Sequence, residues 1–451
     1  MSGKALSNKN AINFFPGHPS PRLLPRKQIL QASTNVLFPS DDSPINNKTY
    51  LDGLQRDPLS YGTDEGSLWV REAIAAWTNK KFHISGQSGQ VEPEFINLTN
   101  GASYGVLNAL LQTTLAHTGY TRQAFITSPC YYLINDCFID AGFKGKITAV
   151  EEGHDGQLDL QFLEHQLQLH EAAQNSSPES TLEIINSDKD ARAWKKIYKY
   201  VIWCVPTFSN PGGMSMSLDN RMKLLELARK YDMLIISDDV YDLLDYRATA
   251  QPPLPRFDIL DRQTLPNGDD DDNDGYGNVI SNVSFSKLVA PGLRFGCQVT
   301  ATHKLSYQLS QGGANTSGGT PSQFNANITG NLMITGELDK IIENFQKVYG
   351  ERSQIMVESI KKYLPADCIL QGGEGGYFMW LTFPDSLNCK KVCEEAKRRG
   401  VNLANGDNFE VDANRKGWGT TSVRLSISFL EKEDIAQGIK ILGEVCHDLL
   451  K

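Results

Sequence analysis

Short apolar runs rich in β-branched residues recur through the middle of the chain. They lie at residues 125–127, 200–205, 233–236 and 279–285. Runs of this length and composition are typical of strands that are buried on both faces of a sheet. We therefore expect several buried strands in this part of the protein.

Helical periodicity appears between these runs. After the run at 200–205, Leu218, Met222, Leu225 and Ala228 recur at spacings of three and four, and Ser217 stands before them as a candidate N-cap. Buried strands that alternate with helices predict an α/β fold with a mainly parallel sheet. Because ligands bind at the carboxyl ends of such strands, the polar residues that follow them are the candidates for chemistry.

The last quarter of the chain has a different pattern. From about residue 340 helical patterns return, with strands expected at 375–381 and 423–429. This mixture suits a smaller α+β domain, which we expect the N-terminal segment to complete. Two polar stretches, 170–190 and 265–278, have the composition of surface insertions.

Composition narrows the class of protein. The 451 residues are enough for a large core, and a formal net charge of -9 with a pI near 5.5 argues against a general polyanion binder. No signal-peptide core and no stretch of ~20 apolar residues is visible, so we expect a soluble, cytoplasmic protein. The eight cysteines are scattered without metal-ligand spacing, which favours reduced thiols and no metal site.

A lysine closes the expected strand at 279–285. Lys287 follows Ser284 and Ser286, and Arg294 comes seven residues later. A strand-end lysine is most often a solvated surface residue. A lysine that forms a Schiff base needs a pocket that disfavours its charged form, and nearby hydroxyls with an arginine can hold a phosphate.

Two other strand ends carry polar residues. Asp238 directly follows the run at 233–236, with Tyr241 three residues later, and Asn210 opens an Asn-Pro-Gly-Gly turn after the run at 200–205. As local structure these are ordinary cap and turn residues. As chemistry, a carboxylate there can keep a pyridine nitrogen protonated, and the phenol and the amide can donate to a ring oxygen.

Three further features have two interpretations each. Ala102 and Ser103 follow Gly101 at a helix start, which is either a plain connection or a phosphate cradle. Tyr131 follows the first strand and suits either core packing or stacking on a flat cofactor. Arg424 interrupts an apolar strand, so it forms either an internal salt bridge or a carboxylate site.

The order of these features resembles the fold-type I pyridoxal phosphate (PLP) enzymes, specifically the class I/II aminotransferases. Within them the chain looks most like the aminoadipate, kynurenine and aromatic aminotransferase branch, as found in fungi. The resemblance spans Phe15 to Phe429. It implies a large PLP-binding domain with a seven-stranded, mainly parallel sheet at 61–335, an N-terminal arm at 1–60 and a small α+β domain at 336–451.

The resemblance also implies roles around the cofactor. Lys287 is expected to carry PLP as an aldimine and then to act as the acid and base of the proton shift. Asp238 is expected at the pyridine nitrogen, Tyr241 and Asn210 at the 3'-oxygen, and Tyr131 against the ring. The phosphate is expected to lie among Ala102, Ser103, Ser284, Ser286 and Arg294.

For the substrate, the resemblance assigns the α-carboxylate to Arg424, with Asn210 and Gly17 as further substrate contacts. It also implies a homodimer, in which Tyr61 reaches the phosphate of the neighbouring subunit. The expected reaction moves the amino group of an L-amino acid, such as 2-aminoadipate or an aromatic one, to a 2-oxo acid such as 2-oxoglutarate.

Some points stay open at this level. Asn-Pro-Gly-Gly replaces the common Asn-Pro-Thr-Gly, which predicts a looser turn, and Ser237 replaces an acid. The same constellation also serves C-S β-lyases and non-catalytic PLP-binding regulators. Regulators of this type carry an N-terminal winged helix, whereas the first 60 residues here are Pro-rich without a basic recognition helix.

Overall fold

The computed structural model describes residues 11–46, 53, 56–173, 195–247, 252–265, 275–319, 322–412 and 414–451. Most of the two expected insertions, at 174–190 and 266–274, lies outside these ranges. None of the helices within them is long and apolar enough to cross a membrane.

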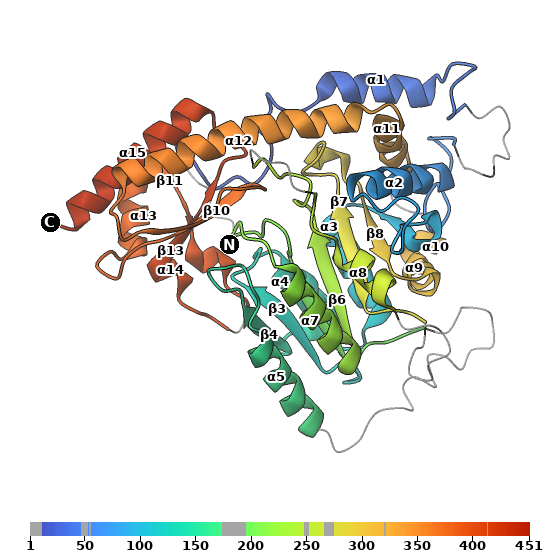
Figure 1. The fold of residues 1–451 in the computed structure, drawn as a ribbon, viewed down its shortest axis with the longest axis horizontal. Helices are drawn as coiled ribbons and strands as arrows, with labels where there is room; N and C mark the ends of the chain where they lie inside the picture. The colour runs from blue at the N-terminus through green and yellow to red at the C-terminus, as the bar shows by residue number, and fades with distance from the viewer. Residues whose placement is uncertain are drawn as a thin grey trace.

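A seven-stranded sheet forms the centre of the larger part (Figure 1). Its strand order is β2-β8-β7-β6-β5-β3-β4, and β8 alone runs antiparallel to its neighbours. The mainly parallel sheet is thus confirmed. The strands are β2 (Ile96–Thr99), β3 (Gln123–Ser128), β4 (Ile147–Glu151), β5 (Tyr200–Cys204), β6 (Met233–Asp239), β7 (Val279–Ser284) and β8 (Gly296–Thr300).

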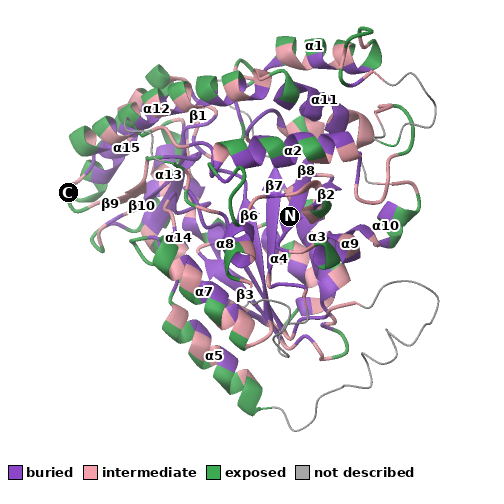
Figure 2. Cartoon of the chain, turned by 45° about the vertical axis from the view of Figure 1, so that its right-hand side comes forward, coloured by how far each residue is buried: buried purple, intermediate pink, exposed green. Residues whose placement is uncertain are grey.

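Helices cover both faces of this sheet (Figure 2), and every strand residue except Thr148 and Glu151 of β4 is buried. Helix α3 (Ala102–Thr113) packs on β6, β7 and β8. On the other face α5 (Leu160–Ala172), α7 (Leu218–Lys230) and α8 (Phe257–Thr264) contact one another in series. Helix α2 (Leu68–Lys81) and α11 (Gln323–Ile334) pack together beside the β2 edge.

Helix α7 is the helix expected after Ser217, and its capping is confirmed, because the Ser217 hydroxyl accepts a backbone N–H of the first turn. Leu225 and Ala228 are buried as predicted. The predicted apolar face was wrong at Leu218, which is 44% exposed, whereas Arg221 is fully buried. Arg221 tolerates this position because its guanidinium donates to three backbone carbonyls.

A smaller antiparallel sheet of order β12-β13-β10-β9 forms the second part. Its strands are β9 (Ile369–Gly372), β10 (Phe378–Thr382), β12 (Ala404–Asn405) and β13 (Ser422–Ser426). The N-terminal segment contacts this part, since β1 (Ile12–Asn13) pairs with β11 (Val401–Asn402) in a separate two-stranded sheet. Helices α13 (Cys389–Arg398) and α15 (Lys432–Leu449) pack around it.

Helix α12 (Glu337–Tyr363) begins near the predicted domain boundary and lies along both parts (Figure 1). Helix α1 (Arg26–Leu37) packs on α11, so the N-terminal segment contacts both parts as well. The boundaries at 60 and 335 stay predictions.

Candidate active site

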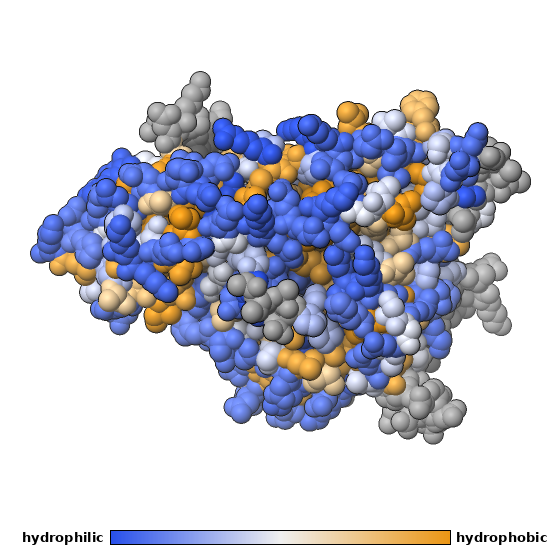
Figure 3. Space-filling view, turned by 45° about the horizontal axis from the view of Figure 1, so that its top comes forward, coloured by the Kyte–Doolittle hydropathy of each residue, from blue (hydrophilic) through white to orange (hydrophobic). Residues whose placement is uncertain are grey.

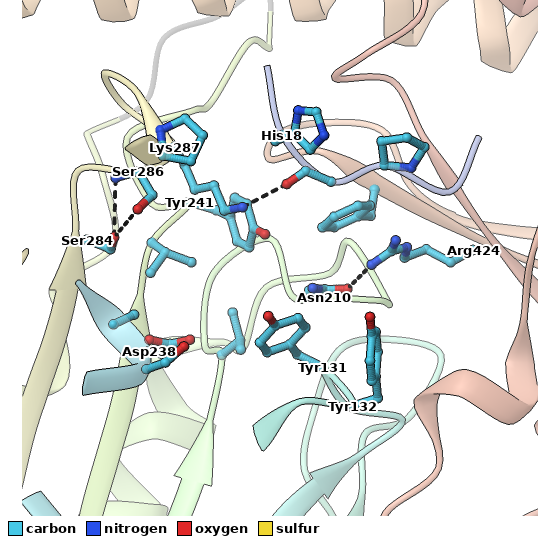
Figure 4. A pocket seen from close by; sticks show the side chains of 18 of the residues that line it. His18, Tyr131, Tyr132, Asn210, Asp238, Tyr241, Ser284, Ser286, Lys287 and Arg424 are labelled. Atoms are coloured by element: carbon cyan, nitrogen blue, oxygen red, sulfur yellow. Dashed lines mark hydrogen bonds between the residues drawn. The ribbon is translucent and has the colours of Figure 1, made fainter. Parts of the chain in front are cut away.

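A cavity of about 500 Å³ opens at the carboxyl ends of the central strands, beneath the N-terminal segment. It brings together all the predicted site residues except Tyr61. Figure 4 shows how Lys287, Asp238, Asn210 and Arg424 surround one space. The predicted residues that line it are Gly17, Ala102, Ser103, Tyr131, Asn210, Asp238, Tyr241, Ser284, Ser286, Lys287, Arg294 and Arg424.

Lys287 lies just after β7, and its Nζ donates to the carbonyl oxygen of Gly17 at 2.7 Å. Its ammonium group also lies over the ring of Tyr377, 5.5 Å from the centroid. Burial lowers the pKa of Lys287 to about 8, and the positive charge of Arg424 adds to the effect. The neutral fraction of this amine near pH 7 is therefore much larger than that of an exposed lysine.

Asp238 lies within β6 rather than after it, which corrects the prediction that the strand ends at 236. The strand continues because Asp238 and Asp239 still pair with β7. Burial raises the pKa of Asp238 to about 7, against a hydrogen bond from Asn282 Nδ2 at 2.9 Å and the charge of Lys287. A cationic group placed against this carboxylate would favour its ionised form.

One end of the cavity is rich in hydrogen-bond donors. The Ser284 and Ser286 hydroxyls are 3.0 Å apart, and the Arg294 guanidinium lies beside them. Helix α3 starts here, and no side chain among the described residues caps it. Gly101 has φ +84°, and a Cβ there would lie 2.8 Å from Arg294 Nη2. Hydroxyls, a guanidinium and an uncapped helix N-terminus together suit a phosphate.

At the other end, Arg424 extends from β13 and is 4% exposed. Its Nη1 donates to Asn210 Oδ1 at 2.9 Å and its Nη2 to the carbonyl oxygen of Phe15 at 2.6 Å. It forms no salt bridge with any described residue, and its Nε is buried without a partner there. Burial lowers the pKa of Arg424 to about 10. The internal salt bridge is thus absent, and the group is suited to an anion.

Aromatic side chains form much of the remaining wall. The rings of Tyr131 and Tyr132 are 5.7 Å apart, and Tyr241 packs edge-on against Phe378. Burial raises the pKa of Tyr131 to about 12 and that of Tyr241 still further. Both phenols therefore stay protonated and can act as donors.

Several residues that line the cavity were not predicted from the sequence, among them Phe15, His18 and Phe378. Phe15 and His18 lie within two residues of Gly17, so the whole segment around Gly17 could have been predicted to line the cavity. Phe378 could not be singled out in this way, because it lies in an apolar strand whose residues are expected in the hydrophobic core.

The Asn210 turn is not loose, which corrects the interpretation of its Gly-Gly sequence. The Gly213 N–H donates to the Ser209 carbonyl at 2.7 Å, and the Ser209 hydroxyl donates to Glu152 at 2.8 Å. A Cβ on Gly212 would lie 2.5 Å from the same Glu152 oxygen. The carboxylate of Glu152 therefore occupies the space that a side chain at 212 would need.

Tyr61 does not reach the cavity of its own chain. Its side chain is 87% exposed and lies beside Gly318. Its role in a neighbouring subunit stays a prediction.

The fold and the site together define a PLP-dependent transferase of fold type I: an amine of lowered pKa, a buried carboxylate, an anion cradle and an unpaired arginine face one cavity. The chain belongs to the aminotransferase class I and II family, whose model matches residues 33–442.

Particular relatives agree with this family. An uncharacterized protein of Saccharomyces cerevisiae, YER152C, is 48% identical over 96% of each chain. Aromatic-amino-acid aminotransferase 1 of Thermococcus litoralis is 24% identical over 99% of this chain and 91% of its own. The kynurenine aminotransferase structure of Pyrococcus horikoshii, in complex with PMP, superposes with a TM-score of 0.72 at 24% identity, covering 98% of this chain and 92% of that one.

The protein is therefore a PLP-dependent transaminase. The donor set fits PLP, because each charged or polar group of that cofactor finds a complementary group in the cavity.

Proposed function

We propose that Lys287 is the residue to which PLP attaches, and that this chain transaminates L-amino acids with a 2-oxo acid such as 2-oxoglutarate. The observation that carries the proposal is the position of the Lys287 amine. It has a lowered pKa and faces a cavity with a carboxylate on one side and an anion cradle on the other. When bound, PLP supplies an electron sink for the bond that breaks at Cα.

The chain's own groups would hold that cofactor in one orientation. Asp238 keeps the ring nitrogen protonated, and the phenol of Tyr241 and the amide of Asn210 donate to the ring oxygen. Tyr131 stacks on the ring. The phosphate lies among Ala102, Ser103, Ser284, Ser286 and Arg294, which gather at one end of the cavity.

The substrate would be held at the other end. Arg424 binds the α-carboxylate through its guanidinium fork, supported by Asn210. Lys287 removes the proton from Cα and returns it at a different atom, which its lowered pKa permits near neutral pH. The backbone carbonyl of Gly17 accepts a hydrogen bond from Lys287, and this part of the backbone shields the reacting groups from water.

The wall beyond Arg424 favours an uncharged aromatic donor over 2-aminoadipate. Phe15, Tyr132, His18 and Phe378 form it. Among the described lining residues the lysine and arginine side chains are Lys287, Arg294 and Arg424, and each already has a partner in this scheme. The side-chain carboxylate of 2-aminoadipate would therefore have His18 as its one remaining basic partner among these lining residues.

We also propose a homodimer, with Tyr61 contributing to the partner's site. Large apolar side chains are exposed at Leu30, Phe38, Leu59 and Tyr61. Apolar atoms interrupt the hydrophilic surface on the face that carries α1 and α12 (Figure 3).

The test combines a variant with a donor screen. The purified protein with PLP should show a visible absorbance that each good amino donor bleaches, and 2-oxoglutarate should restore it. Lys287→Ala should lose the lysine-dependent band and the turnover. An unchanged spectrum in Lys287→Ala would contradict the assignment. Steady release of pyruvate and ammonia from cysteine conjugates would instead identify a C-S β-lyase.

A further inference from the structure

Four amide and carboxylate side chains form one row across the central sheet. Asn97 of β2 pairs in register with Gln298 of β8, Gln298 with Asn282 of β7, and Asn282 with Asp238 of β6. Residues at one register position lie on the same face of a sheet. All four are buried, at 9% exposure or less, under helix α3.

The row binds one face of α3 at successive turns. Asn282 Nδ2 donates to the Ala102 carbonyl at 3.0 Å, and Gln298 Nε2 donates to the Gly105 carbonyl at 2.8 Å. Asn108 in turn donates to Gln298 Oε1 at 3.3 Å. Helix α3, whose N-terminus lines the anion cradle, is thus hydrogen-bonded to side-chain amides of the row at residues 102, 105 and 108.

Asn282 differs from the other two amides of the row, Asn97 and Gln298, because it contacts Asp238, which lines the cavity. The same Nδ2 that binds Ala102 donates to Asp238 Oδ1 at 2.9 Å. Both partners are acceptors, so the amide orientation is fixed by chemistry, with its NH2 group toward both. Its Oδ1 is left buried without a partner in the described part of the chain.

The chain makes room for this arrangement. A Cβ on Gly105 would lie 2.1 Å from Asn282 Oδ1, so any larger residue at 105 would displace the amide. Buried polar atoms are normally hydrogen-bonded, and an unsatisfied one weakens the fold. An apolar residue at 282 would avoid that cost, which indicates that the NH2 contacts themselves are what the site requires.

We propose that Asn282 is a positioning residue that joins the two ends of the cofactor site. One NH2 group fixes the Asp238 carboxylate and the start of α3 relative to each other. Asp238 is the proposed partner of the ring nitrogen, and α3 the proposed partner of the phosphate. Asn282 therefore sets the distance over which PLP must fit, without lining the cavity itself. The inference rests on the function proposed above for Asp238.

The experiment compares PLP binding by apoprotein variants through two readouts, the dissociation constant and the visible circular dichroism per bound PLP. The second reports how firmly the ring is oriented. We expect Asn282→Ala to raise the dissociation constant at least about tenfold, since a hydrogen bond to a charged group is lost, and to reduce the dichroism markedly. Asn97→Ala is the matched control. It is equally buried and donates to Gln298 at 2.9 Å, but it does not touch Asp238.

Gly105→Ala is a second variant. Its added methyl group on α3 should displace the Asn282 amide, while the Asn282 side chain itself is kept. It should lose affinity and dichroism as Asn282→Ala does, so the proposal remains testable if Asn282→Ala does not fold. Wild-type affinity and dichroism in Asn282→Ala, or an equal loss in Asn97→Ala, would overturn the proposal. Asp238→Ala tests the proposed role of Asp238 separately from that of Asn282. Wild-type PLP binding in that variant would refute the role of Asp238 itself.

Discussion

Arg424 is a buried cation whose partners are all neutral. It donates to an amide oxygen and a backbone carbonyl, and its guanidinium lies 4.0 Å from the centroid of the Phe378 ring. These contacts hold the planar group with one edge available to an anion. Lysine would retain the charge but would lose the fork that binds a carboxylate in two places.

We therefore expect Arg424→Lys to raise the KM for the amino donor by about tenfold to a hundredfold, which corresponds to one or two charge-assisted hydrogen bonds. PLP affinity should change little, because Arg424 lies at the opposite end of the cavity from the phosphate cradle. Steady-state kinetics and a PLP titration check the two parts. Arg352→Lys is the control: it is buried as deeply, but it binds Ile427 and Ser428 carbonyls outside the cavity. An unchanged donor KM in Arg424→Lys would remove Arg424 from the substrate site.

Residues with unusual chemistry for their surroundings could be found from the sequence. A lysine that follows two serines at a strand end and an arginine in an apolar strand both conflict with simple burial rules. Phe378 does not, because an aromatic residue in a strand is expected in any core. Asn282 was also missed, since its importance comes from Asp238 and Ala102, which are 44 and 180 residues away.

At the scale of elements, the Asn210 turn and the segment after β4 fit each other. Glu152 accepts from Ser209, and burial raises the pKa of this carboxyl to about 8. Gly212 leaves the room that the carboxylate needs. The two positions should therefore be coupled.

Gly212→Thr alone should lower the melting temperature and raise the amino-donor KM, because its Cβ would overlap the Glu152 oxygen and move Asn210. Gly212→Thr combined with Glu152→Ala should recover part of both losses, with a coupling of about 1 kcal/mol or more between contacting sites. Thermal melts and steady-state kinetics on the four proteins of this cycle measure it. Additive effects would show that the two residues act independently.

The elements themselves were predicted better than their ends. Helix α7 and its Ser217 cap followed from local pattern alone. The end of β6 did not, because pairing with β7 carries it to Asp239. Strand β10 starts at Phe378 instead of 375, since Gly376 has φ +67° and Gly375 lies against the Phe208 ring, which forces a turn. β13 ends at Ser426, after which Ser428 binds the N-terminal segment through the His18 carbonyl.

For the whole molecule, alternating strands and helices were enough to predict the class of fold. The sheet order was not available from the same pattern, because it depends on which strands meet across long connections. The antiparallel strand β8 and the edge strand β4 went unnamed in the sequence, and both complete the sheet. The row from Asn97 to Asp238 exists only because β2, β8, β7 and β6 become neighbours.

The opposite face of the sheet carries a second polar group, built on the residue after Asp238. Ser281 Oγ lies 2.6 Å from Asp239 Oδ2 and 2.8 Å from Asp258 Oδ1. The hydroxyl has one proton and can donate to one of these carboxyls, so the other contact requires a proton on an acid. Asp258 pairs with Arg262 at 2.7 Å. Asp239 is therefore the protonated acid, in agreement with a pKa that burial raises to about 7.

This arrangement makes the stability of the whole fold depend on pH. A carboxyl whose pKa is higher in the folded than in the unfolded state contributes stability below the unfolded value near 4, and this contribution is lost as the pH rises through about 7. Asp239→Asn places an NH2 group where the acid proton was and removes the titration. We expect the variant to lose less unfolding free energy than the parent between pH 6 and pH 8.5, in urea titrations at both values. Asp258→Asn should instead destabilise the protein at both pH values, since it breaks the pair with Arg262. A parent and an Asp239→Asn variant with the same pH dependence would show that Asp239 is ionised in the folded protein and that the shared proton lies elsewhere.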